Sequence, residues 1–325
     1  MCAAHSNHIM VTLMTKSNNT KPAKNRMSRQ KKIAWLWGYI FIAPVILGTL
    51  TFSAGPVLYS FYMSLTDWDG LSPGTPPFVG FGNFISLFRD SYIFKEFTNT
   101  LIYAVGVVPL TIMIAIILAN FLNSRVPARS FFRVVYFLPI VTMPIAVAMV
   151  WRWLFNSEMG LVNFLFRPFG LNPQWLGDAK WIMPALIIVS VWSGVGYATV
   201  ILIAGLQSIA PMYYEVAEID GANFLTKFFR ITLPLLSPTI FFLLITEFIG
   251  AFKAFDIVFM FSGASNTSRG PVTDAIRTMV YGIYERGFTF RTMGYAAAQA
   301  VLLFGFILIF TGLQFLLQSK TVFYD

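Results

Sequence analysis

Long apolar runs restrict this sequence more than any other feature. Six stretches are apolar over roughly the 20 residues that a helix needs to cross a bilayer core. They lie at about 35–58, 98–122, 131–154, 181–205, 235–260 and 293–317. Only helices and closed barrels satisfy their backbone polar groups in lipid, and continuous apolar runs of this length form helices. The expected fold is therefore an all-α integral membrane protein with six transmembrane helices.

Composition excludes several classes of function. Hydrophobic residues make up 57% of the 325 residues and charged residues 11%, as in a membrane protein rather than a soluble domain. The single cysteine is Cys2 and the histidines are His5 and His8, which disfavours disulfides, metal sites and histidine catalysis. The phosphate-binding motif G-x-x-x-x-G-K-[ST] is absent, so this chain is not expected to be an ATPase. We expect no catalytic residue and no metal site.

Charges beside the spans predict the orientation. Residues 1–34 carry seven lysines and arginines and no acid, and basic residues next to a span mark its cytoplasmic side. A basic arm can also bind nucleic acid, but its place directly before an apolar span favours the membrane interpretation. The loop between the second and third spans contains Arg125, Arg129 and Arg133, which also predicts a cytoplasmic position for this loop. Counting crossings then places the 206–234 loop and the short 319–325 end in the cytoplasm.

The same counting places three loops outside, at 66–97, 155–180 and 261–292. Their acidic residues, accompanied by a similar number of basic ones, are Asp67, Asp69, Asp90, Glu96, Glu158, Asp178, Asp274 and Glu285. Mixed charge of this kind suits a surface for a protein partner, and ordinary solvated loops have it too.

The segment from Tyr214 to Pro238 is a charged interruption in an otherwise apolar sequence. Just before it, Pro211 can occupy a first helical turn, after which Met212, Val216 and Ile219 fall on one face. Gly221 then permits a turn into a second short amphipathic run. We expect two short helices at an angle that form a knob for a soluble partner. The alternative is an amphipathic segment lying on the membrane surface.

The residues of this segment resemble a known family. Their order is Glu215, Ala217, Asp220, Gly221, Ala222, Ile231, Leu233, Pro234 and Pro238. It resembles the cytoplasmic coupling motif of membrane subunits in binding-protein-dependent ABC importers, and most closely the sugar-importing branch. Val216 departs from it, because the family usually has alanine there.

Further blocks resemble sugar permeases and together cover most of residues 35–318. They include Asn99–Thr100–Leu101, FFRVVYFLP (131–139), WRWLFNSEMGLVN (151–163) and FKAFD (252–256). The WRWLF block is typical of a subunit that pairs with a second, different permease. The sequence SGASNTSRGP (262–271) departs from the family's tighter turn.

The resemblance implies a 35–318 permease domain that works with several partners. These are a second permease subunit, two ATPase subunits on the inner face, a soluble substrate-binding protein outside and the sugar itself, without nucleic acid. ATP and Mg would bind to the ATPase subunits, so no cofactor is expected in this chain. The implied location is the bacterial inner membrane, with both termini cytoplasmic.

The resemblance also implies which residues couple the chain to the ATPase. They are Glu215, Ala217, Glu218, Asp220, Gly221, Ala222 and Pro234. Glu215 and Asp220 are expected to orient the knob in its cleft, Gly221 to supply the turn, and Pro234 to start the next helix.

Polar and helix-breaking residues within the spans suggest where a substrate passes. Trp192, Ser193 and Tyr197 gather near the middle of the fourth span, and an aromatic face beside hydroxyl groups suits a sugar. Glu247 lies roughly 20 Å into the membrane, counted from Pro234 at about 1.5 Å per residue. An ionisable group at that depth is a functional candidate. Helix packing for the first three, and an interhelical hydrogen bond for Glu247, are the alternatives.

An ATP-independent secondary carrier is the main competing function. Such carriers often contain internal repeats with paired broken helices and several buried charges. No convincing repeat relates the two halves of this sequence, and Glu247 is its chief membrane-buried charge. The identity of the sugar, neutral or acidic, stays open.

Overall fold

The computed structural model describes residues 29–123, 129–263 and 270–321. Most of the basic tail, with Cys2, His5 and His8, lies outside the described residues, as do Arg125, most of the SGASNTSRGP sequence and residues 322–325. Within the described ranges the chain is helical apart from loops and one isolated β-bridge between Thr66 and Phe78.

Four helical runs are long and apolar enough to cross a membrane. The first run comprises α1 (Arg29–Thr49), η1 (Leu50–Ala54) and α2 (Gly55–Ser64), and the others are α4 (Ser91–Asn123), α8 (Ala179–Ser208) and α16 (Met293–Thr321). They correspond to the first, second, fourth and sixth predicted spans. Two bent helix pairs raise the number of candidate spans to six, as the apolar runs predict.

The bent pairs replace the predicted third and fifth spans. The third is divided into α5 (Arg129–Val141) and α6 (Pro144–Leu154), which meet at 112°. Pro144 starts α6 and has no backbone N–H to continue α5, which accounts for a break at this position. For the fifth, the bent pair is Phe224–Leu235 and Ser237–Ser262, with a bend of 62° between them. The second member of this pair comprises α12 (Ser237–Phe252) and α13 (Asp256–Ser262).

The chain divides into two compact units, Met1–Val57 and Leu58–Asp325. In the first unit, α1 buries none of its residues and carries apolar side chains all around its circumference, as expected for a helix surrounded by lipid or by other helices.

The core of the second unit lies where α4, α8 and α12 pack together. Small side chains allow close approach: Ala104 and Ala115 of α4 and Ala198 of α8 are fully buried. At Gly196 of α8, a Cβ atom would overlap the carbonyl oxygen of Tyr136, so α5 rests directly on this glycine. Small residues at such contacts are the rule for helices in membranes.

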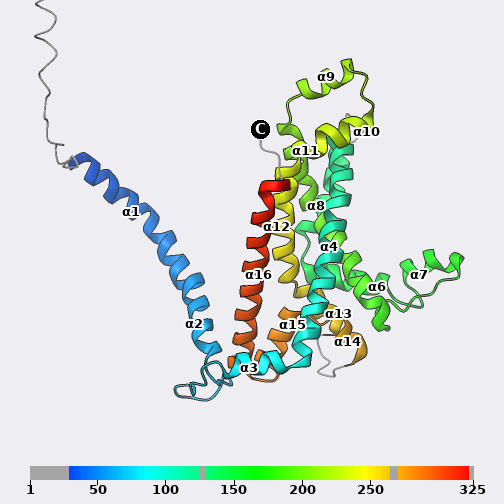
Figure 1. Cartoon of the computed structure of the whole chain (residues 1–325). Helices are drawn as coiled ribbons and strands as arrows, with labels where there is room; N and C mark the ends of the chain where they lie inside the picture. Colours follow the sequence, from blue (N-terminus) through cyan, green and yellow to red (C-terminus); the bar gives the residue numbers. More distant parts are fainter. Residues whose placement is uncertain (1–28, 124–128, 264–269, 322–325) are drawn as a thin grey trace, which may run out of the picture. The chain divides into compact units, whose positions relative to one another are not determined.

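Short helices gather at the two ends of this bundle (Figure 1). At one end, the α9 end, lie α9 (Met212–Ile219), α10 (Phe224–Lys227), η3 (Phe228–Thr232) and α11 (Leu233–Leu235). At the other, the α15 end, lie α3 (Gly82–Arg89), α14 (Pro271–Ile276), α15 (Met279–Tyr284) and η4 (Glu285–Thr289). Helices α4, α8, α12 and α16 run between the two ends.

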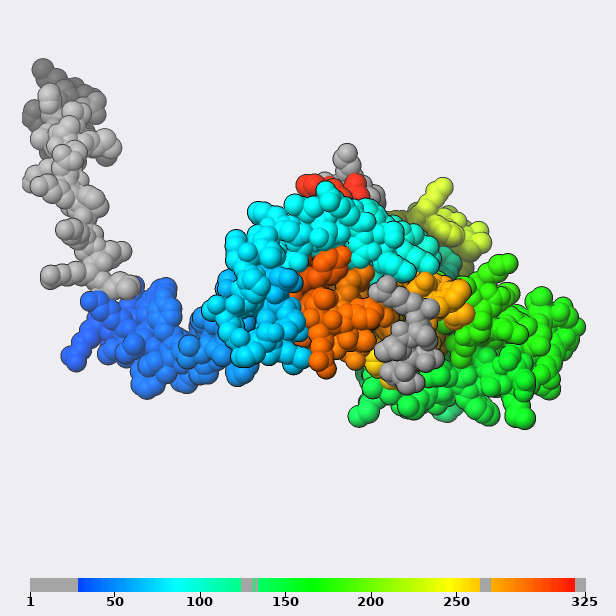
Figure 2. Space-filling model, turned by 90° about the horizontal axis from the view of Figure 1, so that it is seen from below, coloured from blue at the N-terminus to red at the C-terminus, as the bar shows by residue number. Residues whose placement is uncertain are grey.

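Figure 2 views the α15 end. The 271–292 segment, in orange, lies between the cyan part of the chain, which includes α3 and α4, and the green part, which includes α6 and α7 (Leu161–Phe166). The 271–292 segment therefore sits inside this end of the bundle, not at its margin.

Candidate functional site

The knob, defined here as residues 212–227, owes its shape to a Schellman turn. Helix α9 ends before Gly221, whose φ of 72° lies in the left-handed region. The N–H of Ala222 donates to the carbonyl of Ala217 (2.8 Å), and that of Gly221 to the carbonyl of Glu218 (3.0 Å). Glycine adopts this backbone conformation without the steric penalty that a Cβ atom brings. The predicted turn at Gly221 is confirmed.

Two side chains fix α10 against α9. Asn223 caps α10, its Oδ1 accepting the N–H of Thr226 (2.8 Å). Lys227 Nζ lies 2.7 Å from Glu218 Oε1 and so bridges the two helices. The sequence prediction of two short helices at an angle is therefore confirmed, with Glu218 serving the knob itself.

Apolar side chains of the knob are unusually exposed. The exposed fractions are 63% for Met212, 52% for Val216, 85% for Ile219, 67% for Phe224 and 61% for Leu225. Soluble surfaces rarely group so many large apolar side chains, and such patches mark interaction sites.

The remaining predicted coupling residues surround this patch. Ala217 is buried beneath it, while Glu215, in the first turn of α9, and Asp220 are exposed. Pro234 lies in α11, near the end of the helical run Phe224–Leu235, and the next helix, α12, begins at Ser237. The Tyr214 hydroxyl lies 3.0 Å from Thr232 Oγ1 and links α9 to η3.

In the middle of the bundle, Glu247 of α12 faces Gly194 of α8. A Cβ atom on Gly194 would lie 3.9 Å from Glu247 Oε2 and 3.8 Å from Thr111 Oγ1 of α4. Thr111 is fully buried, and within the described ranges neither its hydroxyl nor that of Ser193 has a hydrogen-bond partner. A bond from Glu247 to another helix, the predicted alternative, is likewise not among the hydrogen bonds of the described residues. Polar groups from three helices thus meet here with bonding capacity left over.

Trp192 and Tyr197 lie apart from this polar meeting point. Trp192 lines an apolar groove of about 480 Å³ between α4, α5 and α8, together with Leu110, Tyr136 and Pro139. Its ring meets that of Trp151 edge to face, with centroids 5.6 Å apart. Tyr197 is 45% exposed and is not among the groove's lining residues. The four predicted pathway residues therefore do not converge on one pocket.

A buried network of charged and polar side chains occupies the α15 end. Glu96 of α4 accepts hydrogen bonds from Arg286 Nη1 (2.8 and 2.9 Å) and from Gln299 Nε2 (2.8 Å). Arg277 Nε lies 3.1 Å from Glu96 Oε1, and Arg277 also pairs with Glu285. Glu96 and Gln299 are fully buried, and Arg277 is only 1% exposed. Buried charges persist only when they are paired, and here each acid faces an arginine.

The edge of this network reaches partly exposed groups. Arg286 Nη2 lies 3.3 Å from Asp90 Oδ2, which also accepts a hydrogen bond from the Tyr295 hydroxyl (3.0 Å). Asp274 pairs with Arg277 (3.4 Å) and with the half-exposed Lys95 (3.7 Å). Of the acidic residues that the sequence places in the outer loops, Glu96 and Glu285 are thus buried, and Asp90 and Asp274 are partly buried.

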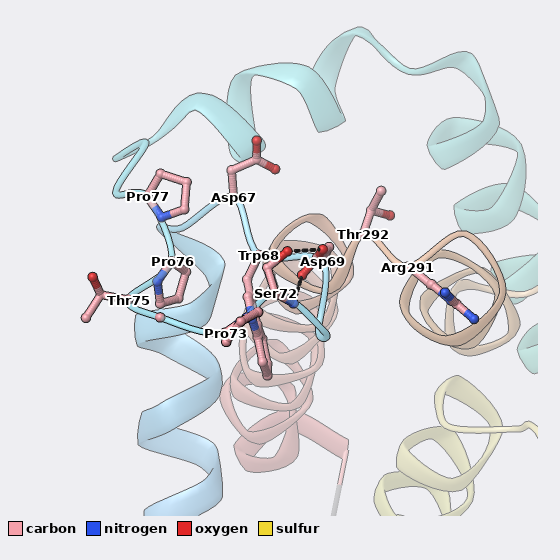
Figure 3. A pocket seen from close by; sticks show the side chains of 11 residues that line it. Asp67, Trp68, Asp69, Ser72, Pro73, Thr75, Pro76, Pro77, Arg291 and Thr292 are labelled. Atoms are coloured by element: carbon pink, nitrogen blue, oxygen red, sulfur yellow. Dashed lines mark hydrogen bonds between the residues drawn. The ribbon is translucent and has the colours of Figure 1, made fainter.

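A pocket of about 350 Å³ opens beside the network (Figure 3). It is lined by residues 67–69 and 72–77, with Arg291 and Thr292 on the other side. Asp69 holds the loop together by accepting the Ser72 hydroxyl (2.6 Å) and the N–H groups of Leu71 and Ser72. The Ser72 hydroxyl bond, followed by these backbone bonds, lowers the pKa of Asp69 to about 2.

Comparison with known proteins identifies the family. A family model described as "Binding-protein-dependent transport system inner membrane component" matches residues 75–322. The chain belongs to this family. The expectation of an ABC importer permease fold, drawn from the 214–238 segment, is confirmed.

Individual relatives extend over nearly the whole chain. The probable ABC transporter permease YesP of Bacillus subtilis (strain 168) is 32% identical over 316 residues, covering 96% of this chain and 99% of that protein. The sn-glycerol-3-phosphate transport system permease UgpA of Escherichia coli O157:H7 is 32% identical over 291 residues, covering 90% and 96%.

A solved structure shares the fold. One chain of a bacterial alginate ABC transporter, crystallised with an alginate pentasaccharide-bound periplasmic protein, superposes with a TM-score of 0.76 at 22% identity. The match covers 91% of this chain and 98% of that one.

Sequence reasoning missed the charged centre of this ABC permease. Glu96 lies five residues after the start of α4, but the apolar run of α4 begins later, so the sequence places this residue in the outer 66–97 loop. Its partner Arg286 is 190 positions away, and no local pattern connects the two. A detectable signal was the excess of charges in the 274–286 segment of a protein with few charges overall.

Proposed function

We propose that this permease is a membrane-spanning subunit of an ATP-driven sugar importer, that it lines the substrate path, and that its knob couples this path to a separate cytoplasmic ATPase. The exposed apolar face of the knob carries the proposal, because Ile219 at 85% exposure and Phe224 at 67% require a protein partner to cover them. The partner would hold ATP and Mg, and this chain no cofactor.

The proposed assembly contains a second permease subunit, two ATPase subunits and a soluble substrate-binding protein. It would lie in the bacterial inner membrane with both ends of this chain in the cytoplasm. The relative named for sn-glycerol-3-phosphate and the fold neighbour from an alginate transporter support a hydroxyl-rich substrate. In such an assembly ATP and substrate would favour different global states, which alternately open the path to the two sides.

The proposed substrate path includes Trp192, Ser193, Tyr197 and Glu247, and we add Thr111. The hydroxyls of Ser193 and Thr111, together with the Glu247 carboxylate, would hydrogen-bond the hydroxyls of a passing sugar. The exposed rings of Trp192 and Tyr197 would contact its C–H faces. Because the two rings lie apart from the polar groups in the conformation described above, a sugar on this path would contact the rings and the polar groups one after another.

The test is purification of this chain from its native membrane, followed by an ATPase assay of what it carries. We expect an ATPase to accompany the chain, and its activity to rise when one sugar-loaded binding protein is added. Recovery of the chain alone, with transport driven by an ion gradient, would contradict the proposal and support a secondary carrier.

A further inference from the structure

The Glu96 network joins three parts of the chain that are distant in sequence. Glu96 belongs to α4, Arg277 and Arg286 to the 271–292 segment, and Gln299 to α16. Each of the four residues is at most 5% exposed. Because a buried charge is costly once it loses its partner, the network has one favourable arrangement. Sliding any of the three parts past the others would leave charges unpaired.

Hydrogen bonds between side chains and the backbone reinforce this connection. Asn99 Nδ2 of α4 donates to the carbonyls of Asp274 (2.8 Å) and Arg277 (3.1 Å), and the N–H of Met279 donates to Thr100 Oγ1 (2.9 Å). From α16, Gln299 Nε2 donates to the carbonyl of Met279 (3.1 Å). The chain around residues 274–279 is thus held by side chains from both helices.

Packing leaves no room for adjustment at the centre. A Cβ atom on Gly282 would overlap the Glu96 carboxylate, so α15 approaches α4 as closely as a glycine allows. These contacts join α4, the 271–292 segment and the start of α16 into one packed body.

An exposed surface belongs to the same body. Phe288 is 65% and Phe290 45% exposed, directly after the network residues. The loop that lines the pocket of Figure 3 is tied to α16, because the N–H of Gly294 donates to the carbonyl of Trp68 (3.0 Å). A contact made on this surface therefore acts on α4 and α16 without an intervening flexible link.

We propose that Glu96 is a positioning residue of the transport cycle. Through Arg277, Arg286 and Gln299 it fixes the 271–292 segment to α4 and α16, so that docking of the soluble binding protein on this segment moves both helices directly. Both helices extend to the end of the bundle where the knob lies (Figure 1). The inference rests on the proposed function, because it assumes a partner that docks outside.

The test compares Glu96→Gln with the neighbouring Lys95→Gln in the assembled transporter. Among the described residues Lys95 pairs with Asp274 alone, at the rim of the network, and its side chain is 50% exposed. Its replacement therefore controls for a change of charge at a neighbouring position. Two quantities are measured: hydrogen–deuterium exchange of the 279–287 amides, and the ratio of ATPase activity with substrate-loaded binding protein to basal activity.

We expect Glu96→Gln to speed exchange in 279–287 and to lower the activity ratio by about 5-fold or more, the lower end of usual coupling between sites, with basal activity retained. Glu96→Asp, which keeps the charge, should restore part of the ratio, and Lys95→Gln should change neither quantity. A purely structural role would speed exchange and leave the ratio unchanged.

Several outcomes would overturn the inference: unchanged exchange in Glu96→Gln, an unchanged ratio, or an equal effect of Lys95→Gln. If Glu96→Gln does not reach the membrane, Glu96→Asp and Arg286→Lys provide the same two measurements. Absence of any copurifying ATPase would refute the proposed function instead, and the exchange experiment would still decide whether Glu96 holds the segment in place.

Discussion

The two ends of the bundle are built on opposite principles. At the α15 end, charged side chains are buried and bonded to one another, with Glu96 fully inaccessible. At the α9 end, apolar side chains are exposed, and one glycine turn and one ion pair maintain the shape. Folding usually places these chemical types the other way round. The charged groups of the α15 end thus find their partners within the chain, whereas the apolar face of the knob is uncovered within the described residues.

This difference between the two ends has energetic consequences that mutations can measure. Removing one member of a buried ion pair strands the remaining charge, whereas exposed groups lose little when they are replaced. Changes at the α15 end should therefore appear in global stability. Changes at the α9 end should appear in coupling.

The largest expected effect is on stability, from Glu96→Ala. It leaves Arg286 and Arg277 without their shared carboxylate, and we expect a loss of about 3–5 kcal/mol in the free energy of unfolding. Thermal unfolding in detergent measures the change. The matched variant is Glu215→Ala, which removes an exposed acid from the knob and should stay within about 0.5 kcal/mol of the wild type. Equal stability losses at the two sites would remove the contrast between the ends.

The second prediction concerns the turn of the knob. Gly221→Pro forces φ to about −65° and removes the N–H that bonds Glu218, at a local cost of about 3 kcal/mol. We expect coupled ATPase activity and transport in proteoliposomes to fall to background, while the thermal stability of the spans is retained.

Gly221→Asn is the control for that experiment, because asparagine tolerates the left-handed region better than other non-glycine residues and the structure leaves open space there. It should keep most of the coupled activity. Normal transport by the Gly221→Pro variant would exclude the knob from the mechanism.

The two ends also differ in how far the sequence predicts them. The knob is local: its signals, from Pro211 through Gly221 to Pro234, lie within one short segment, and their order predicts both the helices and the turn. The apolar runs predict the spans for the same reason. Pro144 marks the break in the third span, but the 112° bend at this break and the close approach of α5 to Gly196 are visible only in the three-dimensional structure.

The Glu96 network is non-local, and the sequence could not predict it. Glu96 and Gln299 are 203 positions apart, and their partnership exists only after α4 and α16 have packed. The middle of the bundle is an intermediate case. Depth in the span marks Glu247 as a candidate. That Thr111 of another helix lies beside the same glycine as Glu247 follows only from tertiary structure.

The smallest expected effect separates the two kinds of ion pair. The Lys227–Glu218 pair at 2.7 Å is as short as the Glu96–Arg286 contacts, but the Glu218 side chain is 67% exposed. Exposed pairs contribute about 0.2–1 kcal/mol. Lys227→Ala should therefore speed hydrogen–deuterium exchange of the Ala222 amide, which the turn protects, by roughly 5-fold at most.

Salt provides the control for this experiment. Adding salt to about 1 M shortens the screening length to about 3 Å and should make the exchange rates of the Ala222 amide in wild type and variant similar. The Met279 amide, held within the buried network, should be insensitive to the same salt in both proteins. A strong salt response at Met279, or none at Ala222, would show that burial is not what distinguishes the two ends.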